Sequence, residues 1–201
     1  MGTMAPHVDG MAIAGDAVAV GDVAEISVRP ITPGDAGALE LFHRRLSQRT
    51  VYLRYFYPHP VLSPREIAHL TDVDGRDRLA LVVEHDGELI AVGRYDRIPG
   101  SEDAEVAFVV ADAFQHRGIG TLLLRRMAEA ARPVGITHLR AEVLAENRNM
   151  LDVFLASGFS TETTRDCGTV ELRMSIVPGV TGGCDQPGTL QTTRVPPAAS
   201  A

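Results

Sequence analysis

Residues 109–121 read VVADAFQHRGIGT and join a short apolar run to a glycine-bearing turn. The apolar run predicts a buried strand, and Gln115 to Gly120 predict a turn that opens a helix. Amide groups in the first turn of a helix have no intrahelical acceptor and lie at the positive end of its dipole, so they bind anions. Gly118 and Gly120 lack the Cβ atoms that would keep a phosphate from the backbone, and Arg117 adds a cation. We therefore expect a phosphate-binding loop here.

This loop differs from the two commonest phosphate-binding motifs. A Walker loop ends in Gly-Lys-Ser/Thr, which is absent from these residues. A Rossmann fingerprint opens its domain, whereas this loop follows several expected antiparallel strands. The rest of the chain must therefore decide the class of fold.

Apolar periodicity and turn signals give the order of elements. His85-Asp86-Gly87-Glu88 is typical of a hairpin turn between two strands, and Glu102 and Asp103 are expected in the next turn. The expected order is a strand at 26–29, helices from 32 and from 63, strands at 79–84, 89–97 and 105–110, a helix at 118–132, a strand at 138–144, a helix at 147–157, and strands at 159–164 and 169–177. This order predicts an α/β fold with a single mixed, mostly antiparallel sheet and helices on both faces.

Composition divides the 201 residues into three parts. Residues 1–24 are small, apolar and acidic without periodicity, and we expect a flexible N-terminal arm. Residues 178–201 are rich in Pro, Gly, Ser and Thr, which predicts a disordered tail. The domain is then expected to span 25–177.

Several classes of function are disfavoured by composition. The formal net charge is −7, which argues against a nucleic-acid binder, and no apolar run approaches the roughly 20 residues of a membrane span. Two cysteines do not make a disulfide framework, and the N-terminus lacks the basic start of a secretory signal. The histidines show no spacing typical of metal ligands. We expect a cytoplasmic protein without a metal site.

The chain resembles a known superfamily at two places in the right order. Gln115-x-x-Gly118-x-Gly120 resembles the Gln/Arg-x-x-Gly-x-Gly/Ala acetyl-CoA signature of the GNAT N-acetyltransferases. The second element, an asparagine followed by an aromatic residue and a Gly-Phe pair, is similar to the closing pattern of that superfamily; here it comprises Asn147, Met150, Phe154 and Gly158-Phe159. The resemblance covers about 26–177 and implies the GNAT fold, with acetyl-CoA as co-substrate.

The resemblance also implies positions for acetyl-CoA. The backbone of Phe108, Val109 and Val110 would pair with the pantetheine arm. Asn147 would bind the pantetheine or acetyl region, and Phe154 would pack near the thiol. The pyrophosphate would lie in the loop formed by Gln115, His116, Arg117, Gly118, Ile119, Gly120 and Thr121.

A narrower likeness concerns the acceptor. Residues 46–56, 104–108 and 142–150 resemble the catalytic domain of bacterial Pat-type protein lysine acetyltransferases. That likeness implies a lysine-bearing protein such as an acyl-CoA synthetase as the acceptor. The 201 residues leave no room for the cyclic-nucleotide or acyl-CoA-synthetase-like domains found in that family.

Acetyl transfer to an amine by direct attack needs a base, because a lysine ammonium has a pKa of about 10.4. Glu105 is our first candidate, since it is a charged residue in an otherwise apolar strand, and Glu142 on a neighbouring strand is the rival. A tyrosine often protonates the leaving thiolate in this family, but Phe154 occupies that position. The general acid is therefore unassigned, with Tyr95 a distant candidate.

The acceptor itself stays open. A protein lysine is the leading hypothesis, a small-molecule amine is the second, and a non-catalytic acyl-CoA sensor is the third. An aromatic cluster at 52–57 would close the acceptor side against proteins or form the rim of an open groove.

Overall fold

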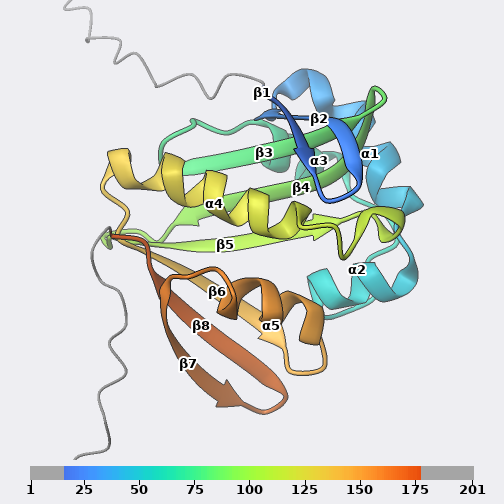
Figure 1. Cartoon of the computed structure of the whole chain (residues 1–201). Helices are drawn as coiled ribbons and strands as arrows, with labels where there is room; N and C mark the ends of the chain where they lie inside the picture. The colour runs from blue at the N-terminus through green and yellow to red at the C-terminus, as the bar shows by residue number, and fades with distance from the viewer. Residues whose placement is uncertain (1–15, 178–201) are drawn as a thin grey trace, which may run out of the picture.

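A computed structural model describes residues 16–177, in which one mixed sheet has helices on both faces (Figure 1). The strands are β1 (Asp16–Val20), β2 (Val23–Pro30), β3 (Arg78–His85), β4 (Glu88–Arg97), β5 (Asp103–Val110), β6 (His138–Leu144), β7 (Ser160–Asp166) and β8 (Thr169–Ser175). The α-helices are α1 (Ala36–Arg45), α2 (Gln48–Tyr55), α3 (Pro64–Thr71), α4 (Ile119–Ala131) and α5 (Arg148–Leu155). The strand order is β1-β2-β3-β4-β5-β6-β8-β7, and every pair of neighbours is antiparallel except β5 and β6. The expected fold class is confirmed.

Strand pairing begins earlier than the sequence predicted. β1 pairs with β2 from Asp16↔Val28 onward, so residues 16–24, which we assigned to the arm, belong to the sheet. The Ala/Val alternation of β1 is too weak to be recognised without its partner strand. The remainder of the expected arm, residues 1–15, and the expected tail, 178–201, lie outside the described residues.

The central hairpin forms where the sequence predicted it. Asp86 and Gly87 both have positive φ, 51° and 77°, which is the backbone of the tight turn that follows the right-handed twist of two strands. The next expected turn is wrong at one position. Asp103 is not a turn residue: it is the buried first residue of β5 and pairs with His138 of β6.

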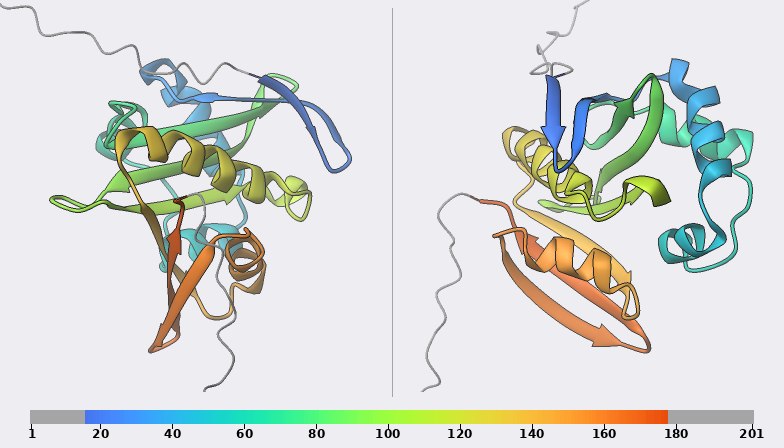
Figure 2. Two further views of the ribbon diagram at one scale, coloured as in Figure 1. Left: turned by 60° about the vertical axis from the view of Figure 1, so that its left-hand side comes forward. Right: turned by 45° about the vertical axis from the view of Figure 1, so that its right-hand side comes forward.

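Two hydrophobic cores lie on opposite faces of the sheet, which alternate along each strand. One core packs α4 and α5 against the sheet through fully buried side chains such as Leu123, Met127 and Leu139. The other packs α1, α2 and α3 against it through Phe42, Val82 and their neighbours. Figure 2 shows α4 on one side of the sheet and α1 to α3 on the other.

Helix α2 was not predicted. Its apolar periodicity is weak, because it buries only Thr50 and Val51, and its first two residues, Gln48 and Arg49, are polar or charged and exposed. It begins at Ser47, whose hydroxyl accepts a hydrogen bond from the amide of Thr50 at 3.1 Å. The helix therefore depends on a cap and on tertiary contacts rather than on an apolar stripe.

The sheet divides at its one parallel junction. β5 and β6 are paired only at Asp103↔His138, Ala104↔Leu139 and Glu105↔Arg140. Beyond Glu105, β5 continues to Val110 in partnership with β4 alone. The two strands therefore diverge and leave a gap that reaches the N-terminus of α4.

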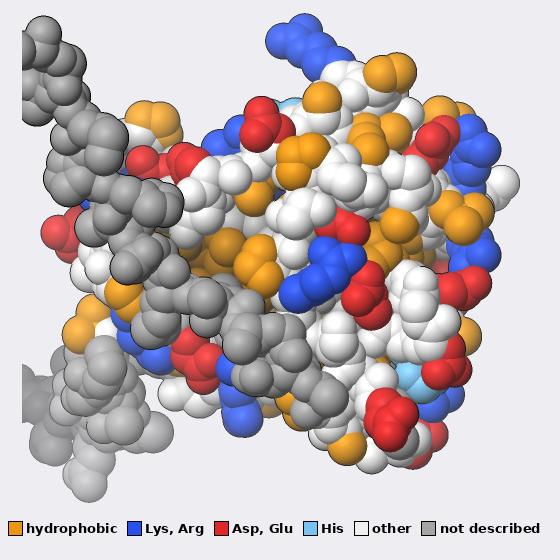
Figure 3. Space-filling model, turned by 90° about the horizontal axis from the view of Figure 1, so that it is seen from above, with side chains coloured by type: hydrophobic (Ala, Val, Ile, Leu, Met, Phe, Trp, Pro, Cys, Tyr) orange, Lys and Arg blue, Asp and Glu red, His pale blue; other side chains and the backbone are white. Residues whose placement is uncertain are grey.

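The surface carries both signs of charge. On the face seen from above, arginine and acidic side chains lie close to one another and alternate with apolar ones (Figure 3). Among the described residues on this face, no continuous basic surface of the kind that binds nucleic acid is present. No helix within residues 16–177 is long and apolar enough to cross a membrane.

Candidate active site

A cavity of about 390 Å³ lies where β5 and β6 diverge. Its walls come from β5, the loop before α4, the first turn of α4, β6 and α5, with α2 at one side. The sequence-predicted residues that line it are Phe108, Val109, Val110, Gln115, His116, Gly118, Ile119, Gly120, Thr121, Glu142, Asn147 and Phe154. Glu105 and Arg117 do not line this cavity. Twelve of the fourteen expected site residues thus surround one space.

The first turn of α4 forms one end of the cavity. Gly118 is the N-cap, with φ +86°, a conformation that side-chain-bearing residues rarely adopt. The amides of Ile119, Gly120 and Thr121 have no acceptor within the helix, so they are available to an anion. A Cβ at Gly120 would stand 3.1 Å from the Phe108 ring, which shows how closely the helix approaches β5. These residues fit a pyrophosphate.

Arg117 points away from the cavity and ties the loop to the β1–β2 hairpin. Its guanidinium pairs with Asp22 at 2.9 Å and lies 5.7 Å from the centre of the Phe114 ring. The β1–β2 hairpin also touches this loop, since a Cβ at Gly21 would stand 2.8 Å from the carbonyl oxygen of Arg117. The hairpin thus supports the loop, and no local pattern predicts this contact because Asp22 lies in the stretch expected to be an arm.

The free edge of β5 forms the floor. Residues 106–110 have no strand partner on the side of β6, so their outward backbone groups can pair with an extended ligand arm. Gln115 occupies the end of this edge, where its side-chain amide donates to the carbonyl of Val110 at 3.1 Å and to the hydroxyl of Thr50 at 3.2 Å. Gln115 therefore shapes the loop as well as lining the cavity.

Helix α5 closes the opposite wall. Asn147 is its N-cap, buried, with its side-chain oxygen accepting a hydrogen bond from the amide of Met150 at 3.3 Å. Phe154 is 2 % exposed, and its ring centre lies 5.2 Å from that of Phe108. This aromatic pair joins α5 to β5 across the narrow part of the cavity.

Sequence reasoning missed the residues that hold α2 against the cavity. The carboxylate of Asp112 accepts hydrogen bonds from the Ser47 hydroxyl at 2.6 Å, the Ser47 amide at 3.0 Å and the Thr50 hydroxyl at 2.7 Å. Burial raises the pKa of Asp112, but the hydrogen bonds from Ser47 and Thr50 outweigh it and leave the pKa below its ordinary value. The Ser-x-x-Thr start of α2 was the available signal, but its partner is more than 60 positions away.

The two candidate bases lie on strands that face a second cavity, of about 400 Å³. Glu105 of β5 lines only this cavity, whereas Glu142 of β6 and its neighbour Ala141 line both. Glu105 and Glu142 are both exposed to solvent. Four of the five charged side chains that line the second cavity are acidic, and two of them, Asp166 and Glu171, come from β7 and β8. The two cavities thus meet at the wall formed by Ala141 and Glu142.

Tyr95 is wrong as a candidate acid. Its side chain is completely buried in the core and lines neither cavity, and its hydroxyl donates to the carbonyl of Arg76 at 3.1 Å. Burial raises its pKa to about 12. Within residues 16–177, no cluster of three or more His, Cys, Asp or Glu side chains could hold a metal ion.

The sequence pattern of the acetyltransferase (GNAT) family matches residues 43–159, which include the loop, the diverging strands and α5. The chain belongs to this GNAT family. It is therefore an acetyltransferase, and members of its family use acetyl-CoA as the acetyl donor. The resemblance expected from Gln115-x-x-Gly118-x-Gly120 is confirmed.

Similar proteins place this GNAT chain near bacterial Pat enzymes. It is 31 % identical over 152 residues to an acetyltransferase of Pseudomonas aeruginosa, covering 74 % of this chain and 82 % of that protein. It is 30 % identical over 156 residues to the acetyltransferase Pat of Mycolicibacterium smegmatis, covering 75 % of this chain and 46 % of the relative. The GNAT domain of S. lividans PAT is 38 % identical and superposes with a TM-score of 0.74, covering 79 % of this chain and 94 % of that domain. The chain thus spans about half the length of the mycobacterial Pat enzyme.

Proposed function

We propose that this GNAT acetyltransferase acetylates a lysine side chain of a protein acceptor in the cytoplasm, with Glu105 as the general base. The observation that carries the proposal is the pair of cavities that share the wall of Ala141 and Glu142. A donor in the first cavity and an amine in the second would meet where β5 and β6 diverge. Glu105 borders the second cavity at that point.

The fit to acetyl-CoA rests on three features of the first cavity. The free amides of α4 suit the pyrophosphate, and the unpaired edge of β5 suits the pantetheine arm. Phe154 and Phe108 supply an apolar end for the acetyl group. When bound, acetyl-CoA supplies the acetyl group as a thioester, whose carbon–sulfur bond breaks as the amide bond forms.

The role of Glu105 is to take a proton from the substrate ammonium, directly or through a water, so that the neutral nitrogen can attack. In the described structure it makes no hydrogen bond or ion pair, which leaves both carboxylate oxygens available. A backbone amide of β5 near Val110 would stabilise the developing oxyanion. Glu142 remains the rival base because it also reaches the shared wall.

The lysine acceptor rests on the likeness to Pat enzymes and on charge. The similarity to the PAT domain of S. lividans and to the mycobacterial Pat supports a protein lysine, and an acyl-CoA synthetase is the acceptor class that this likeness implies. The acidic lining of the second cavity favours a cationic acceptor. The same lining is compatible with a small cationic amine, which is the second candidate.

The test measures thiol release from acetyl-CoA with lysine-bearing proteins, including an acyl-CoA synthetase, and with free amines. We expect release with the protein acceptor, and a fall in kcat of about 100-fold or more in Glu105→Gln with the Kd for acetyl-CoA unchanged. Asp166→Asn is the matched control, because it removes a carboxylate from the same cavity that does not pair with Arg140, and it should change kcat only a few-fold.

Each other outcome has a distinct meaning. Loss of activity in Glu142→Gln but not in Glu105→Gln would move the base to Glu142. Turnover of free amines alone would assign a small-molecule acceptor. Binding of acetyl-CoA without turnover of any acceptor by the wild type would refute catalysis and favour an acyl-CoA sensor.

A further inference from the structure

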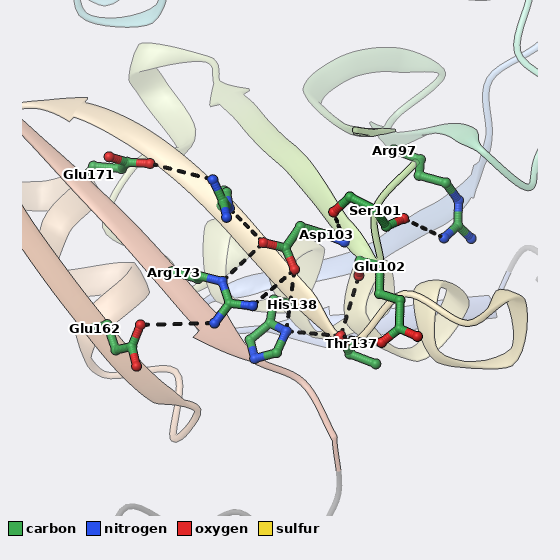
Figure 4. Close-up of polar contacts among 10 residues, drawn as sticks. Arg97, Ser101, Glu102, Asp103, Thr137, His138, Glu162, Glu171 and Arg173 are labelled. Carbon is green, nitrogen blue, oxygen red and sulfur yellow. Dashed lines mark hydrogen bonds and ion pairs between the residues drawn. The ribbon is translucent and has the colours of Figure 1, made fainter. Parts of the chain in front are cut away.

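Asp103 is the buried centre of an ionic cluster at the junction of β5, β6 and β8 (Figure 4). Its side chain is only 6 % exposed. One carboxylate oxygen accepts a hydrogen bond from Nε of Arg140 at 2.6 Å and from Nε of Arg173 at 3.0 Å, and the other accepts from Nη2 of Arg173 at 3.1 Å. Nδ1 of His138 lies 3.4 Å from that second oxygen. One carboxylate thus holds two arginines from two neighbouring strands.

The register of the sheet places one of these arginines beside the proposed base. Arg140 of β6 is paired directly with Glu105 of β5, and with Arg173 of β8 on its other side. Paired residues on neighbouring strands stand on the same face, about 5 Å apart. Glu105 and Arg140 also line the same cavity. Glu105 is therefore the residue of β5 that stands directly opposite Arg140, yet the Arg140 guanidinium pairs with Asp103, two residues earlier on the same strand.

Other charged groups also lie around Glu105, on β4, on α2 and across the second cavity. Asp96 is its partner on β4, and the guanidinium of Arg94 is bound by Asp96 at 2.6 and 2.8 Å. Arg54 of α2 interacts electrostatically with Glu105 but forms no ion pair with it, and its guanidinium lies 5.0 Å from the centre of the Tyr55 ring. The remaining charged groups across the cavity are Glu142, Asp166 and Glu171. Arg140 is thus the arginine in direct register with the base.

We propose that Asp103 is a positioning residue that holds Arg140 away from Glu105 and so keeps the base free of an ion pair. This inference rests on the proposed function. A carboxylate paired with a guanidinium is stabilised in its ionised form and is a weaker proton acceptor. Arg140 pairs with Asp103 rather than with Glu105 because the buried carboxylate of Asp103 cannot be solvated by water and needs a cationic partner. Glu105 is exposed, so water solvates its carboxylate.

Asp103 keeps its charge over the working range of pH. The hydrogen bonds from Arg173 hold the pKa of Asp103 below its ordinary value, and those from Arg140 add to this against the opposing effect of burial. The ion pair between Asp103 and Arg140 is therefore present at neutral pH.

The experiment removes the charge of Asp103 while keeping its shape. In Asp103→Asn, Arg140 loses its 2.6 Å contact with Asp103 and keeps only the longer one to Glu171, at 4.0 Å, so its guanidinium is released to pair with Glu105. We expect the acid limb of the pH profile of kcat/KM to move by about one unit to lower pH, and the plateau to fall about tenfold. The KM for acetyl-CoA should stay within two-fold. In the double variant Asp103→Asn/Arg140→Gln, position 140 no longer offers a guanidinium to Glu105, so the limb should return to its wild-type position.

Glu162→Gln is the matched control for the cluster. It removes a carboxylate that lies 3.9 Å from Arg173 but touches neither Arg140 nor Glu105, so its pH profile should match the wild type. A residue that only stabilises the sheet junction would lower the rate or the melting temperature without moving the acid limb. The pH profile therefore separates positioning of Arg140 from a general structural role.

Three results would overturn the inference. The first is an unmoved acid limb in a folded Asp103→Asn variant, and the second is a double variant as shifted as the single one. The third can be measured even if Asp103→Asn does not fold. It is a shift of the acid limb by 0.5 unit or more to higher pH in Arg140→Gln alone, which would mean that Arg140 already stabilises the ionised form of Glu105 in the wild type. If Glu105→Gln keeps wild-type activity, the proposed base itself fails, which is a separate outcome.

Discussion

Gly118 offers a sharp test of the phosphate loop, because the chain contains a matched glycine elsewhere. Gly118 has φ +86° and caps α4, whereas Gly135 has φ +81° and ends the 3₁₀ turn at Arg132–Val134. An alanine at either position adopts a left-handed backbone that costs about 1–2 kcal/mol. At Gly118 the new Cβ also stands 3.2 Å from Cγ1 of Val20, while at Gly135 it meets nothing within 4 Å.

The two variants should share the same backbone cost, with a further small loss at Gly118 from the Val20 contact, and should differ in ligand binding. For a chain of this size, 1–2 kcal/mol lowers Tm by about 2–8 °C. Of the two glycines only Gly118 lines the cavity, and a methyl group there presses on Val20 and displaces the loop whose amides would bind the pyrophosphate. Loss of one hydrogen bond to a charged group costs about 1.5–3 kcal/mol, which raises the Kd for acetyl-CoA at least tenfold.

Thermal melts give the stability of both variants, and calorimetric titration with acetyl-CoA gives the affinity. We expect Gly135→Ala to bind as the wild type does and Gly118→Ala to bind at least tenfold more weakly. Equal affinities for the two variants at matched Tm loss would refute the assignment of this loop to the pyrophosphate.

Two further predictions concern stability. The hydrogen bonds from Arg29 lower the pKa of Asp35 from 3.8 to about 2, so its stabilisation is present above pH 4 and is lost as pH falls toward 2. Asp35→Asn should lower the free energy of unfolding by about 2 kcal/mol at pH 7 and by much less at pH 2.5, as measured in urea; an equal loss at both values would contradict the linkage. Phe154→Ala should cost about 3 kcal/mol because the ring is 2 % exposed, whereas Leu155→Ala, 55 % exposed, should cost under 0.5 kcal/mol in the same denaturation assay. A loss in Phe154→Ala as small as that in Leu155→Ala would show that the contacts of Phe154 do not stabilise the fold.

Local chemistry made much of the fold predictable. Ser63 and Glu66 form the expected capping box, and Gly158 has the expected positive φ, +83°, after α5. Each of these features depends on residues within about four positions of one another, so a local sequence pattern predicts it. The loop before α4 was equally readable because its glycines and its helix are adjacent.

Features that depend on distant partners were not predictable. Asp103 looks like a turn residue, and only the fold brings Arg140 and Arg173 to it from 37 and 70 positions away. Arg117 was expected to face the pyrophosphate, but Asp22 draws it to the β1–β2 hairpin. In each case an ion pair between segments far apart in sequence decides where the side chain points, and no local pattern indicates that pairing.

The position of β8 between β6 and β7 governs when the site can assemble during synthesis. β8 comes after every other described element, yet it fills an interior place in the sheet and supplies Arg173 to the junction of β5 and β6. A nascent chain released only as far as β7 holds β6 with one edge unpaired and Asp103 without one of its arginines. The meander from β1 to β5 can form early from local contacts, but the divergence of β5 and β6 acquires its final shape only when residues 169–175 have emerged from the ribosome. Assembly of the second cavity, which β8 lines through Thr169 and Glu171, therefore comes late in translation.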